Sequence, residues 1–232
     1  MVLQGNKWLL YVYILVVSVY LFSISIDNEL LELLFKPTLL PVLIFYYIEE
    51  TKKNYSWSFI LMFFSYYIGE MLILVEAQDW NSSSLIFFLF PYIIFIYKLF
   101  KVNSFRLFNF KNKTNNLLIL FLFVFYCFVF YKIMDLVENL QRLDFILYIM
   151  YGILLVTIGT LGAIANIYSL DIKNNNTIIA LLVTFSMSDL FFLLNRNVFE
   201  NKLFEIGYVI CQNFSYYYIM KYYLNCNQNL TK

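Results

Sequence analysis

The chain has 232 residues, of which 62% are hydrophobic and 13% are charged, and its formal net charge is +1. A soluble domain of this size would leave far too much apolar surface in water, so the composition excludes that class of protein. The near-zero net charge gives no indication of a nucleic acid partner.

Two residue types limit the chemistry that the chain can perform. There is no histidine, which removes the commonest metal ligand and general base and leaves carboxylates, Lys, Tyr and Cys. The three cysteines show no C-x-x-C spacing, so neither a disulfide framework nor a zinc site is indicated. We therefore expect no metal and no cofactor.

Apolar stretches of about 20 residues recur along the chain, and each is long enough to cross a hydrocarbon core of roughly 30 Å as a helix. They predict an all-α, polytopic transmembrane helical bundle with about eight membrane-spanning helices, folded as one domain over residues 1–232. The predicted spans are 8–26, 30–48, 56–75, 84–100, 116–134, 143–168, 177–195 and 203–224. Pro37, Pro41 and Pro91 interrupt the second and fourth spans, which membrane helices tolerate where neighbouring groups satisfy the freed carbonyls.

The distribution of basic residues predicts the orientation. With the N-terminus in the cytoplasm, the cytoplasmic links and ends hold eleven Lys and Arg residues, and the opposite side holds four. Because basic residues accumulate on the cytoplasmic side, we expect both termini to be cytoplasmic. The first span has only Lys7 ahead of it and lacks an A-x-A site, so we expect a retained helix instead of a cleaved signal peptide.

Two acidic residues at membrane depth are the main site candidates. Glu70 lies in the third predicted span and Asp189 in the seventh, and neither has a basic residue three or four positions away. A charge at bilayer depth costs about 2.5–3.5 kcal/mol on the insertion scale, so such groups normally face the interior, pair, or stay protonated. We expect the two carboxyl groups to face one cavity, with Asp189 the more buried and Glu70 nearer the mouth.

Other polar residues of the spans have two interpretations each. Glu32 and Lys36 are four residues apart, which predicts an ion pair on one helix face; alternatively, Lys36 borders a polar cavity beside Pro37. Tyr208 and Gln212 fall on one face of the last span, where they either line the cavity or form hydrogen bonds between helices.

Four short motifs resemble a known family. In chain order they are FKPTLLPV (35–42), GE (69–70), FSMSDLFFLL (185–194) and YVICQ (208–212). They are similar to the Lys-Pro, Gly-Asp, F-x-x-S-D and Y-x-x-x-Q elements of the YhhN-like lysoplasmalogenase family, in the same order over most of the chain. Glu70 stands where Asp is usual in that family, and Leu181 stands where the family has a glycine.

The resemblance implies eight spans and hydrolysis of the vinyl ether bond of lysoplasmalogens to a fatty aldehyde and a glycerophospho-alcohol. It also implies that Glu70 and Asp189 are catalytic. The implied substrate-binding residues are Lys36, Ser188, Tyr208 and Gln212. The expected partner is a lysophospholipid with one alkenyl chain, which reaches the site from the bilayer.

The chemistry of the residues agrees with this activity. Vinyl ether hydrolysis begins with protonation of a carbon and continues with the addition of water to an oxocarbenium ion, so it needs an acid and a carboxylate. The competing hypothesis is a small transporter or lipid-binding membrane protein without catalytic activity, whose buried acids relay protons or hold a ligand.

Overall fold

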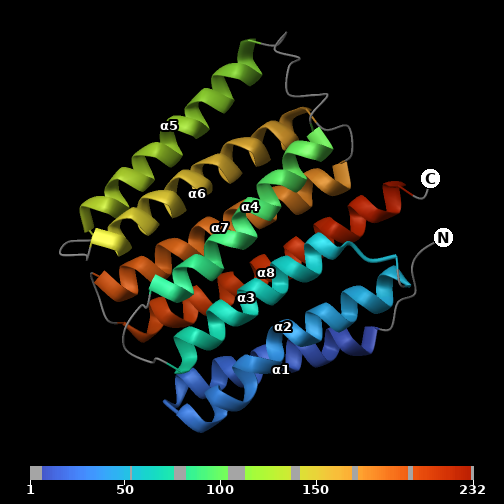
Figure 1. Ribbon diagram of the computed structural model, residues 1–232, viewed down its shortest axis with the longest axis vertical. Helices are drawn as coiled ribbons and strands as arrows, with labels where there is room; N and C mark the ends of the chain where they lie inside the picture. The colour runs from blue at the N-terminus through green and yellow to red at the C-terminus, as the bar shows by residue number, and fades with distance from the viewer. Residues whose placement is uncertain are drawn as a thin grey trace.

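The computed structural model describes residues 7–52, 54–75, 82–103, 113–136, 142–168, 172–197 and 201–230. Over these residues the chain forms eight helices, packed side by side in Figure 1. They are α1 (Lys7–Ser25), α2 (Glu29–Thr51), α3 (Trp57–Val75), α4 (Ser82–Asn103), α5 (Lys113–Leu136), α6 (Arg142–Tyr168), α7 (Ile172–Asn197) and α8 (Lys202–Leu230). Each predicted apolar span corresponds to one helix, so the predicted all-α fold is confirmed.

The ends of α2 follow from its local sequence. The side chain of Asn28 caps the helix by accepting a hydrogen bond from the backbone N–H of Leu31, with 3.1 Å between the two atoms. The helix ends at Lys52, which has the left-handed φ of 48° that lets its N–H turn back to the last turn. Pro37 and Pro41 lie inside α2, which stays helical across both.

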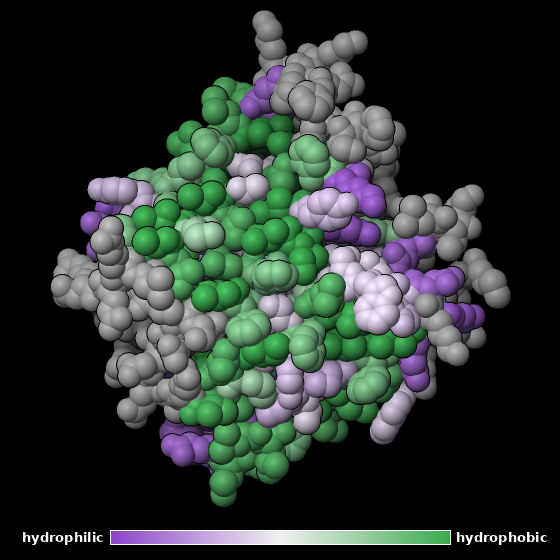
Figure 2. Space-filling model, in the orientation of Figure 1, coloured by the Kyte–Doolittle hydropathy of each residue, from purple (hydrophilic) through white to green (hydrophobic). Residues whose placement is uncertain are grey.

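The composition of the helices matches a membrane protein. Within the described ranges, six helices, α1 to α6, are long and apolar enough to cross a membrane, and α7 has a shorter apolar stretch at Asn176–Phe192. Figure 2 shows an apolar band across one face of the bundle, with hydrophilic residues toward the two ends of the helices. The helices α7 and α8 are less apolar than the others because they carry most of the polar side chains described below.

The order of the helices across the bundle decides which side chains can meet. Sequence neighbours pack as pairs, α1 on α2, α3 on α4, α5 on α6 and α7 on α8, and α8 also packs against α1 and α2. The helix α6 joins the pairs by packing against both α4 and α7. In Figure 1, α5 lies at one edge, α1 and α2 lie at the opposite edge, and α3, α4, α7 and α8 lie between them.

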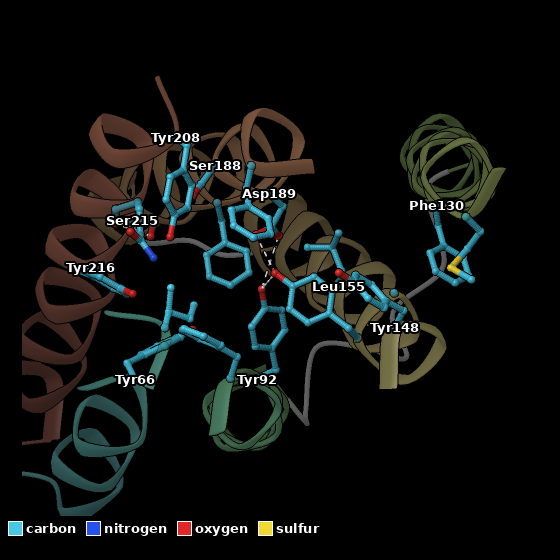
Figure 3. A pocket seen from close by; sticks show the side chains of 18 residues that line it. Tyr66, Tyr92, Phe130, Tyr148, Leu155, Ser188, Asp189, Tyr208, Ser215 and Tyr216 are labelled. Carbon is cyan, nitrogen blue, oxygen red and sulfur yellow. Dashed lines mark hydrogen bonds between the residues drawn. The ribbon is translucent and has the colours of Figure 1, made fainter. Parts of the chain in front are cut away.

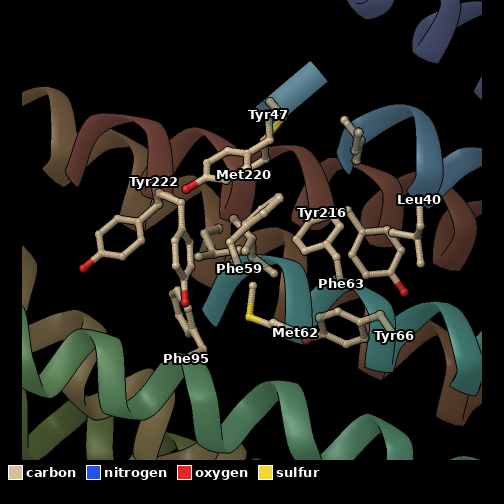
Figure 4. Packing of buried hydrophobic residues seen from close by; sticks show 14 of the residues in the cluster. Leu40, Tyr47, Phe59, Met62, Phe63, Tyr66, Phe95, Tyr216, Met220 and Tyr222 are labelled. Carbon is tan, nitrogen blue, oxygen red and sulfur yellow. The ribbon is translucent and has the colours of Figure 1, made fainter. Parts of the chain in front are cut away.

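Buried aromatic rings from α2, α3 and α8 form the core at one end of the bundle (Figure 4). The ring centroid of Phe59 lies 3.9 Å from that of Tyr47 and 4.2 Å from that of Phe63. Asn227 near the end of α8 donates a hydrogen bond of 2.8 Å to the Tyr47 hydroxyl. Close packing holds membrane helices together, and each aromatic pair adds about 0.5–1.5 kcal/mol. This core fixes α8 against α2 and α3. It therefore also fixes the position of the polar face of α8 along the bundle.

A second contact fixes α8 at the opposite end of the bundle. The Nζ of Lys202, at the start of α8, lies 2.6 Å from the Oδ2 of Asp27 in the turn between α1 and α2. The Asn201 side chain caps α8 by accepting a 2.9 Å hydrogen bond from the N–H of Leu203. The α1–α2 and α7–α8 links therefore lie at the same end, as alternating spans require.

Candidate functional site

A pocket of about 850 Å³, including the open space at its mouth, lies among α3, α4, α5, α6, α7 and α8. Its residues come from the halves of these helices that adjoin the α3–α4, α5–α6 and α7–α8 links. Four predicted site residues line it: Ser188, Asp189, Tyr208 and Gln212. The structure thus brings these four side chains together, and tyrosine and phenylalanine rings make up much of the remaining wall.

Two tyrosine hydroxyls hold the Asp189 carboxyl group (Figure 3). The hydroxyl of Tyr151 on α6 donates to Oδ1 over 2.6 Å, and the hydroxyl of Tyr92 on α4 lies 3.4 Å from Oδ2. The two tyrosine hydroxyls are also hydrogen-bonded to each other. No basic side chain pairs with Asp189 among those that the structure describes. A carboxyl group at membrane depth is therefore satisfied by neutral phenols from two other helices.

The Glu70 carboxyl group has different partners. Its Oε2 lies 3.2 Å from the Nζ of Lys36, and the exposed fractions of the two side chains are 6% and 12%. Its Oε1 accepts hydrogen bonds from the Gln212 Nε2 at 2.5 Å and from the Tyr216 hydroxyl at 3.0 Å. The helices α2, α3 and α8 thus meet at one carboxylate, which a cation and two hydrogen-bond donors satisfy.

The predicted ion pair between Glu32 and Lys36 is wrong, because Lys36 pairs with Glu70 instead. An ion pair within one helix contributes only about 0.2–0.5 kcal/mol, whereas a buried acid without a cation costs about 3–5 kcal/mol. Because leaving Glu70 without a cation would cost more than the Glu32–Lys36 pair would contribute, Lys36 pairs with Glu70. The alternative interpretation fits better, since Lys36 borders a small pocket whose lining includes the polar side chains of Glu70, Gln212 and Asn213.

The two acids line adjoining pockets, so the expectation of one shared cavity is wrong. Glu70 lines the smaller pocket and Asp189 the larger, while Gln212 and Tyr216 line both. These two side chains of α8 occupy the space between the acids. The expected order of burial is also reversed: Glu70 is 4% exposed, whereas Asp189 keeps more accessible surface because the larger pocket opens beside it.

Sequence reasoning missed the three tyrosines whose hydroxyls lie within hydrogen-bonding distance of the two acids. Tyr216 follows Gln212 by four residues and continues the polar face of Tyr208 and Gln212, so extending that pattern by one turn would have found it. Tyr92 and Tyr151 carried no such signal, because the chain contains 21 tyrosines and no spacing distinguishes these two from exposed ones such as Tyr97 or core ones such as Tyr47.

The site has the groups for acid and base chemistry and for binding water. A hydrogen bond links the Tyr208 and Gln212 side chains, and Ser188, which is 4% exposed, lies beside Asp189 on the same wall. In the part of the chain that the structure describes, no cluster of His, Cys, Asp and Glu side chains is arranged to hold a metal ion.

Comparison with known protein families gives a match over most of the chain. The family model of the YhhN family matches residues 31–224, a range that begins in α2, ends in α8 and includes every predicted site residue. No curated protein and no solved structure matches the chain.

Proposed function

The chain belongs to the YhhN family, and on that premise we propose that it is a membrane hydrolase that cleaves the vinyl ether bond of lysoplasmalogens. The products are a fatty aldehyde and a glycerophospho-alcohol. The observation that carries the proposal is the carboxyl group of Asp189, which two tyrosine hydroxyls hold in a largely apolar pocket at membrane depth.

In the proposed reaction, Asp189 gives its proton to the vinyl carbon that does not bear oxygen. The adjacent carbon becomes an oxocarbenium ion, and water adds to it while returning a proton to the Asp189 carboxylate. The bond between the hemiacetal carbon and the glycerol oxygen then breaks: the hemiacetal hydroxyl loses its proton and becomes the aldehyde carbonyl, and the glycerol oxygen gains a proton and leaves as the alcohol. One water is consumed, no electrons are transferred, and the acid is regenerated.

The partners of Asp189 suit this role. An acid must carry its proton before the reaction, and a cation beside it would favour the ionised form. Tyr151 and Tyr92 are neutral, and their hydroxyls are within hydrogen-bonding distance of the carboxylate that proton transfer leaves behind. Asp189 is therefore the proton donor of the proposal.

Glu70 supports the reaction through a neighbour. Its Oε2 pairs with the Lys36 ammonium group, and its Oε1 accepts a hydrogen bond from the Gln212 amide, which fixes the orientation of that amide. Gln212 lines the larger pocket as well, together with Tyr208 and Ser188. In the proposal these three polar side chains bind the attacking water, and Glu70 with Lys36 positions Gln212.

The test is an assay of membranes from a strain that expresses the protein. We expect a lysoplasmalogen added to these membranes to release free aldehyde, and the Asp189→Asn variant to lower the rate by about 10²–10⁴-fold, the usual contribution of a general acid. Asp135→Asn is a matched control, since Asp135 is 61% exposed near the end of α5. Equal rates from Asp189→Asn and the wild type would overturn the assignment.

The alternative is a lipid-binding membrane protein or small transporter without catalytic activity. It is favoured by the Lys36–Glu70 ion pair, because both charges are already satisfied within the protein, as in a static binding site. The same membranes distinguish the two functions. Binding of the lysolipid without release of aldehyde would support the alternative.

A further inference from the structure

The larger pocket is polar at one end and apolar at the other. In Figure 3, Tyr208, Ser188, Ser215 and Tyr216 lie on one side of Asp189, and Tyr148 and Phe130 lie on the other. Tyr66 of α3 lies on the same side as these residues of α7 and α8, and α5 contributes Phe130 and Met134 to the pocket lining. The proton donor of the proposed reaction therefore lies between a polar compartment and a hydrocarbon-lined one.

The helix α5 forms the outer wall of the apolar end. It lies at the edge of the bundle and packs against α6, and its outer face carries exposed rings such as Phe121 and Phe128. The part of the pocket that Phe130 and Met134 line is thus separated from the bilayer by a single helix. In the described chain the other pocket helices, α3, α4, α6, α7 and α8, each pack against at least two neighbours.

The contact between α5 and α6 depends on two glycines. A Cβ atom at Gly152 would collide with the ring of Phe130, and one at Gly159 would lie 2.5 Å from the ring of Tyr126. The Tyr126 hydroxyl also lies 3.4 Å from the Ser186 hydroxyl of α7. Tyr126 is thus fixed by a polar contact as well as by packing, whereas Phe130 rests over Gly152 by ring packing and borders the pocket directly.

We propose that the α5 end of this pocket binds the hydrocarbon chain of a single-chain lipid, and that Phe130, seated over Gly152, is the wall between that chain and the bilayer. The inference rests on the proposed function in taking a lysolipid as the ligand. The polar part of the lipid then lies at the Tyr208 and Ser215 end, and the bond next to the chain lies beside Asp189.

Phe130 selects the lipid chain by steric exclusion and contributes little to binding affinity. Lipid tails are as apolar as the pocket lining, so a chain gains almost nothing in hydrophobic free energy when it moves from the bilayer into the pocket. Close packing against a rigid ring still excludes a chain that is too long. Phe130 therefore sets the upper limit of chain length.

The first experiment locates the chain with a probe that the enzyme cannot hydrolyse. A saturated single-chain ether lysophospholipid with a diazirine on its last carbon is photolysed in membranes that contain the full-length protein, and the labelled peptides are identified by mass spectrometry. We expect labelling of Phe130, Met134 or Tyr148 that excess unlabelled lysolipid removes. Labelling confined to the Tyr208 and Ser215 end, labelling only of the lipid-facing Phe128, or no labelling would overturn the inference.

The second experiment replaces Phe130. Competition by unlabelled lysolipids of increasing chain length is measured for the wild type, for Phe130→Ala and for the milder Phe130→Leu, each checked for folding by its thermal unfolding. We expect the wild type to discriminate against the longest chains, and Phe130→Ala to lose that discrimination. Phe128→Ala is the matched control, because Phe128 lies on the same helix and is 57% exposed. Unchanged discrimination in folded Phe130→Ala or Phe130→Leu would refute the role of Phe130.

These readouts separate this inference from the proposed function, because the probe has no vinyl ether and its binding needs no turnover. Labelling at the α5 end without release of aldehyde from lysoplasmalogen would support the chain site and contradict the hydrolase. Release of aldehyde with labelling only at the polar end would support the hydrolase and contradict the chain site.

Discussion

Lys36 on α2 and Glu70 on α3 form an interhelical ion pair inside the bundle, with 3.2 Å between Nζ and Oε2. Taking two charges out of water costs more than their attraction returns unless further hydrogen bonds satisfy the carboxylate. Gln212 and Tyr216 supply these bonds from α8. The pair therefore joins the structural core to the residues of the candidate site.

Loss of one partner of this pair should destabilise the protein strongly. Lys36→Ala leaves the buried Glu70 carboxylate without its cation, and we expect a loss of about 3–5 kcal/mol in the free energy of unfolding. The double variant Lys36→Ala, Glu70→Gln removes both charges and should lose less. Thermal unfolding in detergent and the yield of folded protein measure both effects.

The exposed ion pair of α5 is the control for this prediction. The Nζ of Lys132 lies 3.7 Å from the Oδ2 of Asp135, and the two side chains are 55% and 61% exposed. Lys132→Ala should therefore lower the free energy of unfolding by no more than about 1 kcal/mol. If Lys36→Ala unfolds at the same temperature as Lys132→Ala, the buried pair does not stabilise the bundle.

The hydroxyl of Tyr151 should matter for turnover more than for folding. Tyr151→Phe removes the 2.6 Å hydrogen bond to Asp189 Oδ1 and keeps the ring in place. A hydrogen bond to a charged group contributes about 1.5–3 kcal/mol, so we expect the rate of aldehyde release to fall by roughly 10- to 150-fold. Tyr131→Phe makes the same change at an exposed ring of α5 and should leave the rate unaltered. A Tyr151→Phe variant as fast as Tyr131→Phe would contradict this role.

The helices could be predicted from the sequence, because a span in lipid must satisfy its own backbone and be apolar over its whole length. The prediction of spans across the prolines of α2 and α4 is correct, since both helices continue through these prolines. Asp189, Ser188, Tyr208 and Gln212 could be selected because each lies in a short motif or on a shared helix face, and in the structure these four line one pocket.

The pairing between helices could not be predicted in the same way. The partner of Lys36 depends on how α2 and α3 pack, and spacing along the chain reports only on neighbours within one helix. The division into two pockets depends on where the Gln212 and Tyr216 side chains extend between the acids. Tyr92 and Tyr151 become partners of Asp189 only after α4, α6 and α7 have assembled.

The orientation in the membrane remains a prediction from the basic residues, and the fold makes it testable at two points. The ion pair between Asp27 and Lys202 requires the α1–α2 and α7–α8 links to lie on one side. With cytoplasmic termini, a phosphatase that is active only outside the cytoplasm should be active when fused at Asn201 and inactive when fused after Lys113. The reverse pattern would invert the bundle and transfer the larger pocket to the cytoplasmic half.

Gln212 has two proposed roles, binding the attacking water and donating a hydrogen bond to Glu70, and a pair of variants should separate them. Gln212→Leu and Tyr216→Phe each delete one donor to Glu70 Oε1, so both should lower stability by about 1.5–3 kcal/mol. Only Gln212→Leu also removes an amide from the larger pocket, where the proposal uses it to bind water. We therefore expect similar unfolding temperatures for the two variants and a much lower kcat for Gln212→Leu. Equal kcat values would show that Gln212 acts only by holding Glu70, and that the attacking water is bound elsewhere in the pocket.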